Sequence, residues 1–219
     1  MCFSATASFL TAAVVGGVGI ISITQTKNIR ELPLASIPFF FAVQQAAEGG
    51  LWLTLPVAPE SAISTVLTEI YLIFALVFWP VFSPLAALLI EPQPSRRRLI
   101  GVSLAFGIAI AAYFLWLSVA LPHSAEIADG HISYRTGSEA PFIAIGLYLL
   151  ATTVGLLLSS HRAIVLLGLV VLAGYVTTLY FYATAMTSVW CFFAAAASVV
   201  IVGHFEWTRV QRPASVPAP

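Results

Sequence analysis

The strongest constraint on this chain is a series of long apolar stretches that are almost free of charge. Charged residues make up only 8% of its 219 residues, and hydrophobic residues make up 60%. Soluble domains are typically about 25% charged, so the composition excludes an ordinary soluble globule. Nine basic residues balance nine acidic ones, which argues against a basic nucleic-acid-binding face. We expect the lipid bilayer as the main partner of the chain, and no nucleic acid.

Seven stretches are long enough to cross about 30 Å of hydrocarbon at about 1.5 Å per residue. The sequence predicts an all-α fold, with one domain over residues 1–211 that forms a seven-transmembrane-helix bundle, followed by a disordered tail at 212–219. The expected spans are 3–26, 34–55, 63–90, 99–121, 141–159, 163–187 and 189–208. The division at Thr187-Ser188-Val189 is the least marked, because it contains neither glycine, proline nor charge.

Basic residues fall almost entirely on one side of this arrangement. Arg135 is alone on the other side, and the remaining cations are Lys27, Arg30, Arg96, Arg97, Arg98, Arg162, Arg209 and Arg212. Cytoplasmic connections carry the excess of lysine and arginine in membrane proteins. The pattern therefore predicts an N-terminus outside and a C-terminus in the cytoplasm.

Two carboxylates lie inside expected spans, Glu48 in the second and Glu69 in the third. Counting from the outer ends puts both at roughly 9–12 Å depth, where they could approach one another. Gln44, Gln45, Glu48 and Trp52 share one helical face. A carboxylate near the bilayer centre costs about 2.5–3.5 kcal/mol on insertion scales. The open alternatives are a hydrogen-bonded glutamate that joins helices, or a role in proton handling, cation coordination or catalysis.

The sulfur atoms gather at the expected outer end, where Cys2, Cys191 and Met186 lie. One interpretation is a Cys2–Cys191 disulfide on an oxidising face. A second is buried free thiols that pack as small hydrophobes. A third is thiol redox chemistry, or a soft metal such as copper held by the cysteines with Met186 or His131.

Residues 122–140 form the only long connection, and they contain His131. Such a loop can fold back as a lid over an outward cavity, although a solvated loop histidine is the simpler interpretation. Tyr182 shares a face of the sixth span with Tyr175 and Met186, which fits hydrogen bonding between helices or the lining of a pocket. Trp79 is expected at the lipid-facing or interfacial surface.

Absent motifs narrow the function further. The only lysine, Lys27, lies in a connection, which excludes a retinal Schiff base inside the bundle. The chain has no phosphate-binding loop, dinucleotide fingerprint or nucleophile elbow. No enzyme class, cofactor or oligomeric state is therefore indicated.

The functional hypothesis is an outward-facing polar pocket built from Gln45, Glu48 and Glu69, covered by residues 122–140 and flanked by Cys2 and Cys191. It would bind a small ligand or metal, with redox activity left open. The alternatives are a proton-coupled transporter or channel, and an assembly or sensory partner of other membrane proteins.

Several short motifs resemble an uncharacterised bacterial membrane-protein family. The motifs are Met1-Cys2-Phe3-Ser4-Ala5, Gln44-Gln45 with Glu48-Gly49 and Trp52, Phe78-Trp79-Pro80, Glu91-Pro92, His131-Ile132-Ser133-Tyr134 and Ser188-Val189-Trp190-Cys191. The resemblance implies a multi-span protein of the bacterial inner membrane in a family without an assigned activity.

Overall fold

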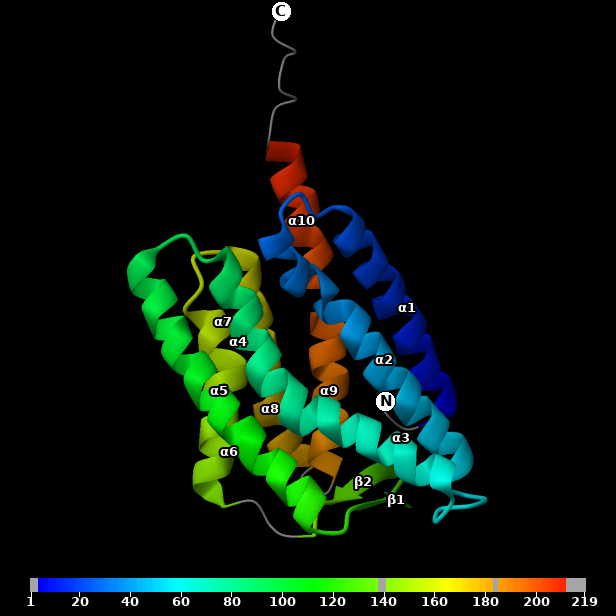
Figure 1. Ribbon diagram of the computed structural model, residues 1–219. Coiled ribbons are helices and arrows are strands. Elements are labelled where there is room, and N and C mark those ends of the chain that lie inside the picture. Colours follow the sequence, from blue (N-terminus) through cyan, green and yellow to red (C-terminus); the bar gives the residue numbers. More distant parts are fainter. Residues whose placement is uncertain (1–3, 138–140, 183–184, 212–219) are drawn as a thin grey trace, which may run out of the picture.

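The computed structural model describes residues 4–137, 141–182 and 185–211, with side chains up to Glu206. Cys2 and the predicted tail at 212–219 lie outside these residues. The described part forms a bundle of helices with one small β-hairpin (Figure 1).

The bundle contains seven helical segments within the described residues, two of which change helix type along their length. A short 3₁₀ turn, η1 (Ile29–Glu31), precedes the second. The segments are α1 (Ala5–Thr24), α2 (Leu32–Thr54), α3–η2–α4 (Ala62–Leu72, Ile73–Phe78, Trp79–Ile90), α5 (Pro94–Ala120), α6–η3–α7 (Phe142–Leu149, Leu150–Val154, Gly155–Leu157), α8 (Arg162–Phe181) and α9–α10 (Met186–Ala197, Val200–Gln211).

Five of these segments are long and apolar enough to cross a membrane: Ala5–Thr24, Ala62–Ile90, Pro94–Ala120, Arg162–Phe181 and Met186–Glu206. The segment Phe142–Leu157 is apolar but shorter. The helix α2 is not among the five, because Gln44, Gln45 and Glu48 interrupt its apolar sequence. All three of these side chains are fully buried, so the neighbouring helices shield the polar part of α2.

Two sequence predictions are wrong in detail. The chain leaves the helix after Phe181 and re-enters one at Met186, so Thr187-Ser188-Val189 lies inside α9 and divides no spans. Tyr182 at this break has a non-helical backbone (φ −140°, ψ 39°). The sequence contains neither glycine nor proline there that would have predicted it. The fold is also not purely α, because the long connection contains two strands.

Those strands are β1 (Ser124–Ala128) and β2 (His131–Arg135), which pair antiparallel. Asp129 and Gly130 form the two-residue turn with φ angles of 51° and 73°. Positive φ at both positions is the geometry that suits the twist of a tight hairpin, and Asp-Gly is a preferred pair for it. Ile132 is fully buried and packs with Leu51 of α2 and with Leu55 directly after that helix. The hairpin therefore lies against the bundle, as a lid would.

Two segments, η2 and η3, are π-helical, and the residues around them touch. The hydroxyl of Tyr148, two residues before η3, donates a hydrogen bond to the Ala75 carbonyl in η2. Close by, Gly107 of α5 lets that helix approach α4, since a Cβ at this position would lie 1.9 Å from the Pro80 carbonyl oxygen. Single π-helical turns often occur at functional sites, and these two converge at one level of the bundle.

The two ends of the bundle differ in character (Figure 1). The hairpin and the start of α3 lie at one end, which we call the hairpin end. The connections α1–α2, α4–α5 and α7–α8 lie at the opposite end, together with α10. The described basic residues at that opposite end are Lys27, Arg30, Arg96, Arg97, Arg98 and Arg162.

Candidate functional site

A buried polar cluster on α2 lies towards the hairpin end. The spacing of Gln44, Gln45 and Glu48 places them on neighbouring parts of one helical surface. The Ser188 hydroxyl of α9 donates to Glu48 Oε1 at 2.5 Å, and Gln45 Nε2 donates to Glu48 Oε2 at 3.4 Å. Tyr71 of α3 lies beside the same carboxylate. Three helices therefore supply the surroundings of Glu48.

The cluster continues to α4 through an indole. Trp79 Nε1 donates to Gln44 Oε1 at 2.7 Å, and the Trp79 ring stacks on Phe41 with centroids 3.8 Å apart. Trp79 is only 4% exposed, so the prediction of a lipid-facing or interfacial tryptophan is wrong. The apolar composition of its helix concealed that role, because a helix that is apolar all round does not reveal which face is internal.

Two atoms of the cluster have no hydrogen-bond partner among the described residues. They are Gln44 Nε2 and Gln45 Oε1. Nor does any described lysine, arginine or histidine side chain form an ion pair with Glu48. Leaving a buried polar atom unpaired costs about 1–3 kcal/mol, and buried carboxylates are normally paired. The cluster thus has unused hydrogen-bonding capacity and a carboxylate without a cationic side chain.

Cys191 borders this cluster from α9. It is a buried free thiol, and it lies beside Tyr71, Gln44 and Glu48. Its predicted disulfide partner Cys2 lies outside the described residues. Among the described residues there is no group of three or more histidine, cysteine or acidic side chains that could hold a metal.

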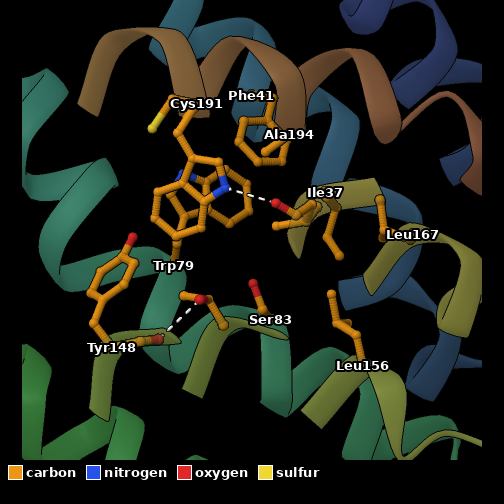
Figure 2. A pocket seen from close by; sticks show the side chains of 12 residues that line it. Ile37, Phe41, Trp79, Ser83, Tyr148, Leu156, Leu167, Cys191 and Ala194 are labelled. Carbon is orange, nitrogen blue, oxygen red and sulfur yellow. Dashed lines mark hydrogen bonds between the residues drawn. The ribbon is translucent and has the colours of Figure 1, made fainter. Parts of the chain in front are cut away.

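Two adjoining cavities lie next to the cluster. The outer chamber, about 210 Å³, extends from the hairpin to α9 and α8. The inner chamber, about 40 Å³, lies deeper among apolar side chains (Figure 2). Both are lined by Tyr148, Trp190 and Cys191. The outer chamber is the larger of the two and has room for a small molecule.

The hairpin forms one wall of the outer chamber. Tyr134 and Thr136 line it, and the Tyr134 ring stacks in parallel on Tyr71, with centroids 4.4 Å apart and an angle of 3° between the rings. Tyr134 of this pair thus belongs to the hairpin, and Tyr71 belongs to α3, where it lies beside Glu48. The hairpin is coupled directly to the buried cluster.

The other predicted site residues fall into two groups. Met186 lines the outer chamber, and the rings of His131 and Tyr182 lie beside one another with centroids 5.3 Å apart. Trp52 packs under the hairpin, where its buried indole nitrogen has no described partner. Glu69 is not brought to the cluster: it is exposed and lies 3.6 Å from His123 Nε2.

Sequence reasoning did not single out Tyr71, Tyr148, Ser188 and Trp190 as members of a site. Hydroxyl and aromatic residues are common in membrane helices, so composition alone does not mark them. A signal for two of them exists, because Ser188 and Trp190 belong to the same short motif as Cys191.

A second buried carboxylate lies at the opposite end of the bundle. Glu91, 3% exposed, follows the last residue of α4. Its oxygens accept from Ser160 N at 2.8 Å, Ser160 Oγ at 2.5 Å, Gln93 N at 3.1 Å and Ser159 Oγ at 3.4 Å. Burial alone would raise the pKa of Glu91, but these donors outweigh it and hold that pKa below its ordinary value.

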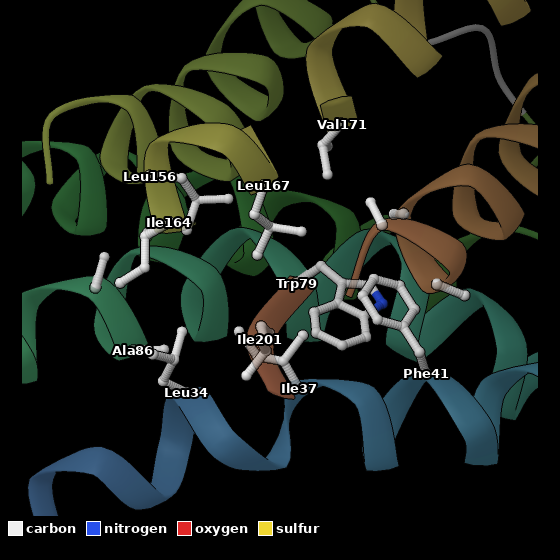
Figure 3. Packing of buried hydrophobic residues seen from close by; sticks show 14 of the residues in the cluster. Leu34, Ile37, Phe41, Trp79, Ala86, Leu156, Ile164, Leu167, Val171 and Ile201 are labelled. Carbon is white, nitrogen blue, oxygen red and sulfur yellow. The ribbon is translucent and has the colours of Figure 1, made fainter. Parts of the chain in front are cut away.

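A hollow of about 350 Å³ adjoins Glu91, and it is lined by side chains of both charges, among them Lys27, Arg30, Glu31, His161 and His204. The apolar side chains of Leu34, Ile37, Ala86, Ile164, Leu167 and Ile201 fill the bundle between this hollow and the inner chamber (Figure 3). All six are 3% exposed or less. The chambers at the hairpin end and the hollow at the opposite end are therefore separate.

The fold and site together define a helical protein with membrane-type apolar helices and an internal chamber covered by a hairpin. Comparison with known protein families identifies it more closely, because a family model matches residues 1–218. The chain belongs to DUF6629, a family of unknown function. Neither a curated protein nor a solved structure matches it.

Proposed function

We propose that this protein is a seven-span protein of the bacterial inner membrane that binds a small ligand in the outer chamber. Its N-terminus and hairpin would face outward and its C-terminus the cytoplasm. The supporting observation for this orientation is the group of described basic residues at the end opposite the hairpin, which the positive-inside rule assigns to the cytoplasm.

The observation that carries the binding proposal is the contact between a chamber and an incompletely satisfied polar cluster. Cys191 lines both chambers and lies beside Glu48. Protein pockets that bind small molecules are mostly apolar with a few placed polar groups, which is the composition of this site. The stacked Tyr71–Tyr134 pair would transmit ligand entry past the hairpin to the cluster.

Native mass spectrometry of gently purified protein tests the proposal. We expect wild type to retain a small-molecule adduct, and Glu48→Gln to lose at least 90% of it. Glu69→Gln is the matched control, because it removes a carboxylate of the neighbouring helix that is exposed and outside the cluster. Equal retention by the two variants, or no adduct in wild type after incubation with a cell extract, would refute the binding site.

The orientation has its own test in intact cells. A cysteine introduced at exposed Ala58, between α2 and α3, should react with a membrane-impermeant thiol reagent above the level of the unsubstituted protein. A cysteine at exposed Ser95, near the start of α5, should react only after the membrane is opened. The reverse labelling pattern would place the chambers on the cytoplasmic side.

Transport is an alternative function, because cavities lie near both ends of the bundle. The apolar side chains packed between them are buried (Figure 3). A polar substrate would require those side chains to part, whereas binding in the outer chamber requires no such change. The structure therefore favours binding over transport, and flux into proteoliposomes that disappears in Glu48→Gln would reverse this preference.

A further inference from the structure

The walls of the outer chamber indicate the chemical class of the ligand, on the assumption that the proposed binding site is correct. We propose that the outer chamber is an aromatic cage for a small organic cation that carries an ammonium group. Aromatic rings attract cations through their negative faces, and quaternary ammonium groups are the ligands that such cages recognise best.

The aromatic lining is extensive and held in place by contacts between rings. Phe114, Tyr134, Tyr148, Tyr175 and Trp190 all line the chamber. Trp190 makes edge-type contacts with both neighbours, at centroid distances of 5.4 Å to Tyr148 and 5.3 Å to Tyr175. Tyr148 in turn lies 6.2 Å from Phe114. Four rings from α5, α6, α8 and α9 thus form one connected wall.

The polar ends of two of these rings are already occupied. The Trp190 indole nitrogen donates to the Val171 carbonyl at 3.0 Å, and the Tyr148 hydroxyl donates to the Ala75 carbonyl. Both polar groups are therefore bonded to the backbone and are not available to a ligand in the chamber. A ligand that depends on hydrogen bonds would find fewer partners there than one that binds to aromatic surface.

The charges around the chamber favour a cation over a neutral molecule. Its lining contains no lysine, arginine or histidine among the described residues. Glu48 lies just behind the wall, beside Cys191 and bonded to Ser188, whose neighbour Thr187 also lines the chamber. A carboxylate at this position would compensate the positive charge of a bound ligand. The ligand would in turn be the cationic partner that Glu48 lacks among the described side chains.

The exposed surface at the hairpin end would guide such a ligand inward. The described acidic residues of the hairpin, of the α2–α3 connection and of α3 are Glu126, Asp129, Glu60 and Glu69, and the same described segments contain one arginine, Arg135. An acidic rim raises the local concentration of cations and speeds their entry at low salt. The ammonium could belong to a free molecule or to a lipid headgroup that reaches in from the membrane.

Choline and its uncharged isostere 3,3-dimethyl-1-butanol provide a direct test. Wild type in nanodiscs of phosphatidylglycerol, which has no ammonium, is titrated with each probe while tryptophan fluorescence is followed. We expect choline to bind at least tenfold more tightly than the alcohol. Equal affinity, tighter binding of the alcohol, or no binding of choline would overturn the cage.

Variants of one ring make the test specific to the aromatic wall. Tyr175→Leu should reduce choline affinity about tenfold, and Tyr175→Phe should restore most of it, because the ring returns. Equal losses in both would contradict a cation–π role. Repeating the titration in phosphatidylcholine nanodiscs separates the two sources: weaker apparent choline binding indicates that a headgroup competes, and unchanged binding indicates a free cation.

Failure of the cage and failure of the proposed function can be told apart. If choline fails to bind while native mass spectrometry still shows an adduct that depends on Glu48, the chamber binds a ligand of another class. If no adduct and no choline binding are found, both proposals fall.

Discussion

The two buried glutamates of this protein occupy opposite ends of one bundle and differ in what surrounds them. Glu91 accepts four hydrogen bonds from the α4–α5 and α7–α8 connections. Glu48 accepts from Ser188 and Gln45, next to amide atoms that have no described partner. A carboxylate satisfied by its own chain stabilises structure, whereas one left incompletely satisfied beside a cavity is available to a ligand.

Exchange of each carboxylate for its amide tests whether the two glutamates differ in role. Glu48→Gln should weaken ligand retention at least tenfold, and Glu91→Gln should leave retention unchanged. Glu91→Gln should lose more stability than Glu48→Gln. A buried carboxylate without a cation is costly, and the amide at position 48 can still accept from Ser188. Native mass spectrometry and thermal unfolding of both variants give the two measurements.

The loss of stability in Glu91→Gln should be the second largest effect. Hydrogen bonds to a charged acceptor contribute about 1.5–3 kcal/mol, and the amide retains only part of them, so we expect a loss of about 1–3 kcal/mol and a lower melting temperature in detergent. An unchanged melting temperature would show that the two loops do not depend on this carboxylate.

Acid should separate wild type from Glu91→Gln. The folded pKa of Glu91 is depressed, so its contribution is fully present above the unfolded value of about 4.3 and is lost as the pH falls through the lower folded value. At pH values below about 4.3, the melting temperature of wild type should therefore decrease, and that of Glu91→Gln should decrease less. Parallel acid curves for the two proteins would contradict the role assigned to these donors.

The hydrogen bond between Trp79 and Gln44 should have a smaller effect. A double-mutant cycle with Trp79→Phe and Gln44→Leu should give a coupling energy of about 1 kcal/mol, measured by denaturation in mixed micelles. A coupling near zero would mean that the indole and amide merely pack side by side.

Glu69→Gln should have the smallest effect of all. Exposed ion pairs contribute about 0–1 kcal/mol, and Glu69 has only His123 as an ionic neighbour among the described residues. We expect a change below about 0.5 kcal/mol in stability and none in ligand retention. A large effect on retention would return Glu69 to the site.

The sequence predicts the helices well because long apolar stretches are a strong signal. It also places Gln45, Glu48, Cys191 and Met186 at the same end, since depth follows from counting residues along a span. The hairpin was not predicted, although Asp129-Gly130 is a typical turn pair for it. The break after Phe181 carries no comparable signal.

The sequence does not reveal which side of each helix is buried inside the bundle. The buried side chains of the third segment include Ser64, Thr68, Tyr71 and Ala75. Glu69 directly follows Thr68, so it points about 100° away from that face. Counting residues gives Glu69 a depth similar to that of Glu48, but its side chain is exposed. Residue counting along a helix predicts depth, whereas the direction of each side chain depends on how the helices pack against one another.

The central claim is that the outer chamber holds a small molecule next to Glu48. A crystal structure of gently purified wild type, grown in a lipidic phase at a resolution that shows small ligands, tests it most directly. We expect non-protein density bounded by Tyr134, Tyr148 and Trp190. A chamber that is closed by its own side chains, or that contains only water after incubation with a cell extract, would contradict it.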